Sequence, residues 1–228
     1  MDQKHASRSS PGVITAYVRR LRLPFQLTLA PLFLWGLFLA GLRSTEVALV
    51  AFVSLHLLLY PGVTAFNSVY DRDSGPVSFM RSPPPPVPPG LLGVSLAMQV
   101  VGAALAASLG LRFLMIYLAI AALAAGYSHP ALRWKACPWK SAVAVALGQG
   151  GLGFLAGWTA GQGGQTAYAM LGFSIATLTT LGLYPLTQVF QVEEDAARGD
   201  RTLGPAVALR VGALALAGAG ALMAVLAY

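Results

Sequence analysis

Seven long apolar stretches constrain the fold of this 228-residue chain more than any other feature. Each approaches or exceeds the length at which about 20 apolar residues cross a bilayer as a helix. The predicted spans are 25–42, 46–68, 90–109, 112–128, 141–160, 167–190 and 203–227. We therefore predict an all-α, polytopic transmembrane helical bundle of about seven spans, formed by one domain over residues 1–228.

The composition is typical of an integral membrane protein and limits the classes of partner that the protein is expected to bind. Charged residues make up 10% of the chain, against about 25% in ordinary soluble domains, and the mean hydropathy is +0.66. The net charge of +7 favours acidic lipid headgroups or anionic substrates, and in so apolar a chain we expect no nucleic-acid partner. The lone Cys137 excludes an intrachain disulfide and a cysteine metal site.

Lys and Arg residues predict the orientation of the spans. The N-terminal segment 1–24 and the connections after the second, fourth and sixth spans hold twelve of the fifteen. Because basic residues concentrate in cytoplasmic loops, we expect these parts in the cytoplasm, in an inner membrane of bacterial or archaeal type. Within the N-terminal segment, Val13–Arg22 is amphipathic and is expected to lie along the membrane surface.

An internal repeat relates the ends of the second and sixth predicted spans. Shifting Leu59–Gly75 by 124 positions places it on Leu183–Gly199. Six residues are then identical: Leu59, Tyr60, Pro61, Phe66, Asp71 and Gly75 fall on Leu183, Tyr184, Pro185, Phe190, Asp195 and Gly199. Each copy is the polar end of an apolar helix that finishes in acids, and a proline in each copy predicts a bend before those acids.

Each copy of the repeat carries a polar stripe along one helical face. An amide precedes an Asp by four residues in both copies, as Asn67 and Asp71 and as Gln191 and Asp195. The stripes run back through Tyr60 to His56 in the first copy and through Tyr184 to Thr180 in the second. We expect the two stripes to face each other across one site. For His56, an interhelical hydrogen bond and a general base are alternative roles.

The acids concentrate at this expected site. Six of the eight Asp and Glu residues occupy two connections: Asp71, Asp73, Glu193, Glu194, Asp195 and Asp200. Two carboxylates about 4 Å apart repel by roughly 4 kcal/mol at an effective dielectric near 20, so they titrate together or hold a divalent cation. Carboxylate and amide oxygens suit Mg²⁺, and neighbouring Arg and Lys outline a diphosphate site. The alternative is that these are solvated loop charges.

These residues also form motifs. Asn67-Ser-Val-Tyr-Asp71-Arg-Asp73 ends the second span, and Gln191-Val-Glu-Glu194-Asp195-Ala-Ala-Arg-Gly199-Asp-Arg-Thr202 ends the sixth. Arg22-Leu-Pro24 opens the first span, and Tyr127-Ser-x-Pro130-x-x-Arg133-x-Lys135 leaves the fourth. In order and spacing the chain resembles the UbiA superfamily of intramembrane prenyltransferases.

The resemblance implies a bundle around a central cavity that opens to the cytoplasmic side, with Mg²⁺ and a prenyl diphosphate at its mouth. The implied metal ligands are Asn67, Asp71, Asp73, Gln191, Glu194 and Asp195. The implied diphosphate-binding residues are Arg22, Arg72, Arg81, Lys135, Arg198 and Arg201. The implied catalytic residues are Asp71, Asp195, Asn67, Tyr60 and Tyr184. Departure of the diphosphate leaves an allylic carbocation, which tyrosine rings can shield by cation–π contact.

The chain departs from the family pattern at two motif positions and in length. Gly75 and Gln191 stand where acids are expected, and the family usually has nine spans. Either this is a short member or partner subunits, as in a homo-oligomer, complete the bundle.

The first functional hypothesis is a Mg²⁺-dependent prenyltransferase that uses a lipophilic, typically aromatic, acceptor. The alternative is a membrane terpene cyclase, which ionises the same diphosphate without an external acceptor. A transporter is disfavoured because the charges gather at the cytoplasmic ends of the spans and not at midplane.

Overall fold

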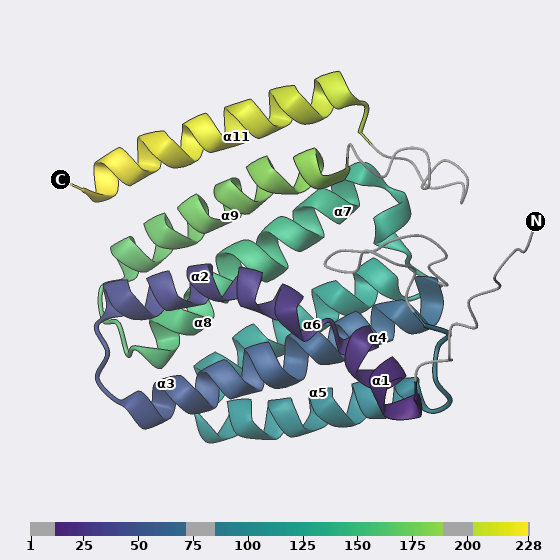
Figure 1. Cartoon of the computed structure of the whole chain (residues 1–228). Coiled ribbons are helices and arrows are strands. Elements are labelled where there is room, and N and C mark those ends of the chain that lie inside the picture. The colour runs from purple at the N-terminus through teal and green to yellow at the C-terminus, as the bar shows by residue number, and fades with distance from the viewer. Residues whose placement is uncertain (1–11, 72–84, 189–202, 228) are drawn as a thin grey trace, which may run out of the picture.

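The computed structural model describes residues 12–71, 85–188 and 203–227, and every regular element in these ranges is helical (Figure 1). The elements are α1 (Val13–Leu21), α2 (Leu23–Ala40), α3 (Thr45–Phe52), η1 (Val53–Leu59), α4 (Tyr60–Asp71), α5 (Leu91–Ser108), α6 (Leu111–Ser128), η2 (Trp134–Ala136), α7 (Pro138–Val145), η3 (Ala146–Gly151), α8 (Leu152–Ala160), α9 (Thr166–Gln188) and α11 (Pro205–Leu226). The all-α prediction is confirmed.

Seven helical stretches in the described residues are long and apolar enough to cross a membrane. Two of them are composite: α3, η1 and α4 form the second, and α7, η3 and α8 form the fifth. The others are α2 with the preceding α1, then α5, α6, α9 and α11. The number of spans and their order therefore agree with the sequence prediction.

The amphipathic N-terminal segment forms a separate helix, α1. Arg22 ends it with a left-handed backbone, φ 48°, and α2 starts at the next residue with Pro24 in its first turn. A non-glycine residue rarely adopts this conformation, so the chain changes direction sharply at Arg22. The placement of α1 at a membrane surface stays a prediction.

The second span contains a π-helical segment, η1, directly before Pro61. The amide of Tyr60 donates to the carbonyl of Leu55, five residues back. Proline has no N–H and its ring clashes with the carbonyl four residues earlier, so a wider turn before it relieves the conflict. In the second copy of the repeat, α9 stays α-helical through Pro185.

Different tertiary contacts accompany this difference between the copies. Ser54 in η1 donates to the carbonyl of Gly102 in α5 at 2.8 Å. His56 packs against the rings of Phe33, Phe52 and Tyr60. At the repeat spacing, Leu178 and Thr180 occupy these two positions in α9. Ser54 and His56 therefore make contacts that stabilise the widened turn in the first copy. Leu178 and Thr180 cannot make these contacts in the second copy.

Helices α2 and α8 cross with their backbones almost in contact. A Cβ built at Gly157 would lie 1.9 Å from the carbonyl oxygen of Phe33, and one at Gly36 would lie 2.2 Å from that of Phe154. Glycine is therefore required on both sides of the crossing. The small side of each helix thus allows the two backbones to approach closely.

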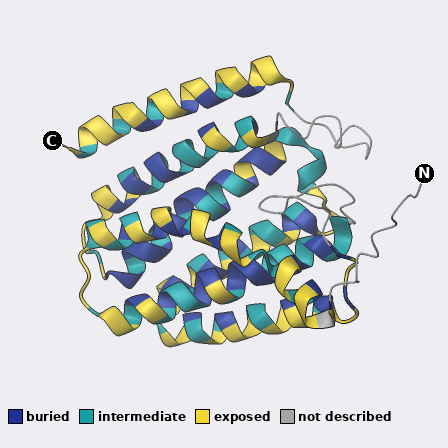
Figure 2. Ribbon diagram, viewed as in Figure 1, coloured by how far each residue is buried: buried dark blue, intermediate teal, exposed yellow. Residues whose placement is uncertain are grey.

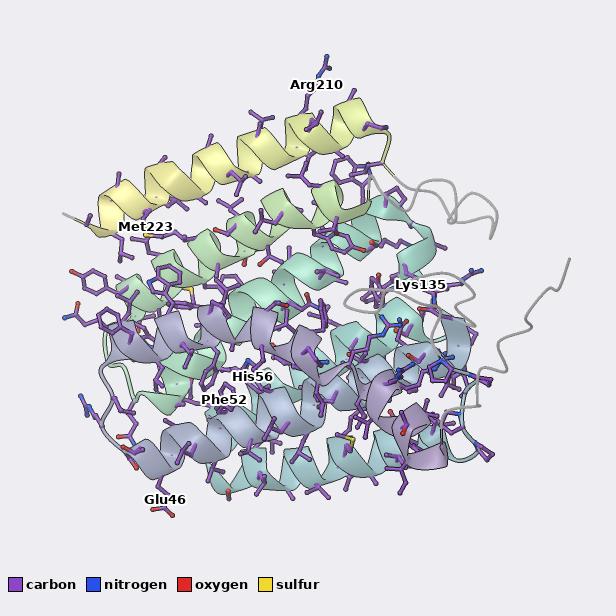
Figure 3. All side chains as sticks on the ribbon, in the orientation of Figure 1. Glu46, Phe52, His56, Lys135, Arg210 and Met223 are labelled. Atoms are coloured by element: carbon purple, nitrogen blue, oxygen red, sulfur yellow. The ribbon has the colours of Figure 1, made fainter. Side chains whose placement is uncertain are left out.

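The buried core lies between the second span and helices α2, α6 and α8, and it includes Phe33, Leu55, Tyr60, Phe113 and Tyr117. Helix α11 packs on α9 at the edge of the bundle and is exposed along most of its outer face (Figures 1 and 2). Arg210 projects outward from α11 (Figure 3). An exposed apolar face of this kind fits contact with lipid tails.

Most of the described basic residues belong to elements at one end of the bundle, the end to the right in Figure 1. We call this the motif end: it comprises α1, the C-terminal end of α4, η2 and the C-terminal end of α9. Its described cations are Arg19, Arg20, Arg22, Arg133, Lys135 and Lys140, whereas Arg43 and Arg112 lie at the opposite end. That the motif end faces the cytoplasm stays a prediction.

Candidate functional site at the motif end

Asp71 is the centre of the described part of the site. Asn67, one helical turn earlier, donates from Nδ2 to Asp71 Oδ2 at 2.5 Å. The other carboxylate oxygen, Oδ1, forms an ion pair with Nζ of Lys135, which arrives from η2 (Figure 3). The side chains of Lys135 and Asp71 are 12% and 13% exposed, so solvent screens this pair only weakly.

Ser128 completes this cluster. Its hydroxyl donates to Asn67 Oδ1 at 2.8 Å, and the residue is 3% exposed. Asn67 is thereby fixed on both sides, with its amide on Asp71 and its oxygen on Ser128. Ser128 lies within the Tyr127–Lys135 motif but is not among the residues predicted for the site; its place beside Tyr127 was the available signal.

The local fold brings Lys135 over the end of α4. Helix α6 ends at Ser128, and Arg133 then takes a left-handed backbone, φ 39°, which turns the chain into η2. Trp134 packs on Gly126, where an added Cβ would lie 2.8 Å from the indole ring. The adjacent Lys135 is therefore held by the packing of its neighbour as well as by Asp71.

A second polar group forms around Tyr184 of the other repeat copy. Its hydroxyl lies 2.6 Å from Ser141 Oγ and 3.1 Å from the Tyr127 hydroxyl. Tyr127 and Ser128 are neighbours at the end of α6, and they reach Tyr184 and Asn67 respectively. Helix α6 therefore links the two copies of the repeat. Ser141 is likewise not among the residues predicted for the site from the sequence.

Tyr60 lies far from the ion pair. It precedes Asp71 by eleven residues on the same helix, which corresponds to about 16 Å along the axis. The residue is 2% exposed, and its ring packs edge-on against His56 with centroids 5.3 Å apart. Tyr60 therefore belongs to the core of the bundle, whereas Tyr184 lies close to the motif end.

His56 is a buried packing residue in this structure. Its ring stacks on that of Phe52 (Figure 3), with centroids 4.4 Å apart and planes 10° apart. The ring of Phe33 meets it edge-on. Neither ring nitrogen makes a hydrogen bond of normal geometry. The ring interacts only weakly with the backbone of Leu29 in α2 and of Phe52, so the expected interhelical contact is a weak polar one and packing is the main role of His56.

Arg22 is placed at the motif end by the junction between α1 and α2. Gln26 fixes this junction, because its Nε2 donates to the carbonyl of Leu21 at 3.2 Å and to Thr64 Oγ1 in α4 at 3.2 Å. Gln26 is 2% exposed. The helix that carries Asn67 and Asp71 is thus fastened to the turn that carries Arg22.

Several nominated residues lie outside the described parts of the chain: Arg72, Asp73, Arg81, Gln191, Glu194, Asp195, Arg198 and Arg201. Within the described ranges, no three His, Cys, Asp or Glu side chains gather as a metal site. The meeting of the two acidic motifs therefore stays a prediction, as does the full set of metal ligands.

Comparison with known proteins identifies the family. The sequence pattern of the UbiA prenyltransferase family matches residues 29–228. The chain belongs to this family. The match includes both copies of the repeat and both polar groups described above. A comparison with curated proteins gave no significant match.

Solved structures of a UbiA homologue share the fold of this family member. The homologue from Archaeoglobus fulgidus bound to DMAPP and Mg²⁺ is 24% identical, with a TM-score of 0.76; the match covers 91% of this chain and 76% of the homologue. For the form bound to GPP and Mg²⁺ the identity is 22%, the TM-score is 0.75, and the coverage is 92% and 76%. For the Cd²⁺-bound form the values are 22%, 0.73, 91% and 76%. The helical bundle of this chain is therefore a UbiA fold.

Proposed function

We propose that this protein is a Mg²⁺-dependent intramembrane prenyltransferase. It ionises an allylic prenyl diphosphate at the motif end and transfers the prenyl group to a lipophilic, aromatic acceptor. Family membership and the DMAPP-bound and GPP-bound homologue structures support the diphosphate substrate. The acceptor class rests on the family resemblance alone.

One observation carries the proposal: the cluster of Asp71, Asn67, Lys135 and Ser128. It brings a carboxylate, a carboxamide oxygen and a cation together at the end of an apolar bundle. A structural ion pair alone would not require an amide held in a fixed orientation beside it. The same end carries Arg22, and in the sequence the second motif follows directly after the described part of α9.

The donor set fits Mg²⁺. Hard oxygen ligands suit this ion, which often uses one or two carboxylates and leaves other positions to water and substrate phosphate. Asp71 and Asn67 would hold it, with Asp73, Gln191, Glu194 and Asp195 as the remaining nominated ligands. When bound, Mg²⁺ neutralises the charge of the departing diphosphate.

The residues of the chain supply the other requirements of the reaction. Lys135 and Arg22 would bind the diphosphate, with Arg72, Arg81, Arg198 and Arg201 as further candidates. The apolar helices exclude water, which would otherwise capture the carbocation. The ring of Tyr184 would shield the cation near the motif end. Tyr60 would contact a more distant part of the isoprenoid chain, because it lies deeper in the bundle.

The test is diphosphate release by purified protein with Mg²⁺ and C10, C15 or C20 prenyl diphosphates, with extraction of organic products. Asp71→Asn keeps the shape of the side chain and removes its charge. Glu46→Gln is the matched control, because Glu46 is exposed and points away from the bundle at the opposite end (Figure 3). We expect turnover that needs an aromatic acceptor, is lost in Asp71→Asn and is retained in Glu46→Gln.

Other outcomes would contradict the proposal. A cyclic hydrocarbon or alcohol formed without acceptor, and lost in Asp71→Asn, would identify a membrane terpene cyclase. Equal activity in Asp71→Asn and wild type would show that Asp71 is not part of the active site. No diphosphate release with any chain length, with and without a panel of aromatic acceptors, would overturn the enzymatic assignment.

A further inference from the structure

His129 is the residue at which the chain leaves α6, directly after Ser128. It precedes Pro130, and a residue before proline is disfavoured in helical backbone and adopts an extended one. Its φ is −65° and its ψ is 133°, as this rule requires. Although the residue is exposed, its side chain makes contacts in two directions.

The first contact organises the turn that follows. Nδ1 of His129 accepts a hydrogen bond from the amide of Ala131 at 3.3 Å, as the side chain of Asn or Asp does in an Asx turn. The backbone carbonyl of His129 accepts from the amides of Leu132 at 3.0 Å and Arg133 at 2.8 Å. One residue thus accepts hydrogen bonds from three successive amides. We call residues 129–133 the His129 turn.

The second contact packs the turn on α4. The centroid of the His129 ring lies 6.5 Å from that of Phe66 and 5.9 Å from that of Tyr70, and these two rings are 5.0 Å apart. All three separations are in the range of favourable aromatic contacts. Phe66 and Tyr70 immediately precede Asn67 and Asp71 in the sequence. The His129 turn is therefore packed on the part of α4 that carries the amide and the carboxylate of the site.

Lys135 depends on this turn for its place beside Asp71. The turn ends at Arg133 in its left-handed conformation, η2 starts at the next residue, and Lys135 is the second residue of η2. The connection thus meets α4 twice, through the ring of His129 and through the ion pair of Lys135. Fixing the turn restricts the conformations of this short connection, so less entropy is lost when Lys135 takes its paired position.

The two contacts together distinguish His129 from a residue that only ends a helix or only packs. Ending α6 would need the hydrogen bond to Ala131 and no ring, whereas packing on α4 would need a ring and no acceptor. His129 supplies both, and it therefore links the shape of the turn to its position on α4.

We propose that His129 is a positioning residue for the prenyl diphosphate site. It needs no contact with metal or substrate, because it acts through the His129 turn on Lys135, the residue that would bind the diphosphate. The effect on ligand affinity rests on the proposed function, whereas the coupling between His129 and Lys135 can be measured without any ligand.

The experiment separates the two contacts by substitution in the full chain. His129→Asn keeps an acceptor for the Ala131 amide and removes the ring, His129→Phe keeps a ring and removes the acceptor, and His129→Ala removes both. Leu132→Ala is the matched control, because Leu132 is 58% exposed in the same turn. His129→Ala is also combined with Lys135→Met, to complete a double-mutant cycle.

The readouts are the Kd for geranyl diphosphate with Mg²⁺, measured by calorimetry without acceptor, and the melting temperature without ligand. We expect His129→Ala to raise Kd about 10-fold and each single-contact variant to raise it about 3-fold, since each loses one modest interaction. Leu132→Ala stays within about 2-fold of wild type. In the Lys135→Met background, His129→Ala changes Kd by less than about 2-fold and lowers the melting temperature less than it does in wild type.

Additive effects of His129→Ala and Lys135→Met would overturn the inference, because they would show that His129 does not act through Lys135. A loss in Leu132→Ala equal to that in His129→Ala would also overturn it, by showing that any change in the turn is harmful. Should His129→Ala fail to fold, His129→Asn and His129→Phe replace it in the cycle. If the wild-type protein binds no geranyl diphosphate, the proposed function fails, and the melting temperatures judge the coupling separately.

Discussion

At the scale of single residues, Lys135 has the largest consequence for the site. It is mostly buried and forms an ion pair with the carboxylate that we assign to metal binding. Removing one partner of a buried pair leaves the other charge uncompensated, which costs about 3–5 kcal/mol. The same side chain is the described lysine best placed to bind a diphosphate next to Asp71.

Lys135→Met should therefore lower kcat/KM for prenyl diphosphate by about 100-fold or more, as loss of a preorganised charge in an active site does. Lys140→Met is the control, because Lys140 is exposed at the same end of the bundle. Initial-rate kinetics with Mg²⁺ would measure both variants. Similar losses in the two would indicate a general effect of surface charge.

Tyr184 offers a test that separates its ring from its hydroxyl. Its hydroxyl contacts Ser141 and Tyr127, whereas cation–π shielding needs only the ring. We expect Tyr184→Phe to retain most of kcat and Tyr184→Leu to lower it at least about 10-fold. Single-turnover diphosphate release would distinguish them. A large loss of kcat in Tyr184→Phe would assign the role to the hydroxyl network instead.

At the scale of helices, sequence periodicity was sufficient for the spans and for the Asn67–Asp71 face. Sequence periodicity did not predict where contacts with other helices change the type of helix. The sequence repeat predicts two equivalent helices, yet only the first copy is preceded by a π-helical segment. Ser54 contacts α5 there and His56 packs in an aromatic cluster. Ser141 was missed because a lone serine has no signal until α7 brings it to Tyr184, whereas Ser128 lay within a quoted motif and its partner became evident only from the packing of α6 against α4.

The crossing of α2 and α8 gives a stability prediction. Gly157→Ala would place a methyl group against the backbone of Phe33, which cannot move aside as a side chain can. Gly148→Ala, in the same span, meets its nearest atom at 3.7 Å, from Leu123, and should be tolerated. We expect Gly157→Ala to lower the free energy of unfolding by about 2 kcal/mol or more.

Thermal unfolding in detergent, followed by size-exclusion chromatography, would compare the two alanine variants with wild type. Equal melting temperatures for Gly157→Ala and Gly148→Ala would mean that the backbones at the crossing are further apart than described.

At the scale of the whole molecule, the bundle has two distinct ends, and Cys137 marks one of them. It lies between η2 and α7 at the motif end and is partly exposed. If the motif end is cytoplasmic, a membrane-impermeant maleimide should label Cys137 in inside-out vesicles and not in right-side-out vesicles.

The control for orientation is Cys137→Ser combined with Gly164→Cys. Gly164 lies in the connection between α8 and α9 at the opposite end, with no atom near an added Cβ. It should label from the other side. The reverse pattern would invert the proposed topology and place the diphosphate site outside the cytoplasm.

The ion pair of Lys135 with Asp71 also has a thermodynamic consequence. Lys135 supplies the counter-charge of Asp71. At the proposed site, a divalent cation alone would have to displace Lys135 from Asp71, and a diphosphate alone would compete with Asp71 for Lys135. With both ligands bound, Lys135 would pair with phosphate and Asp71 with the cation. Each ligand would therefore raise the affinity of the site for the other, and a cation without substrate would bind only weakly.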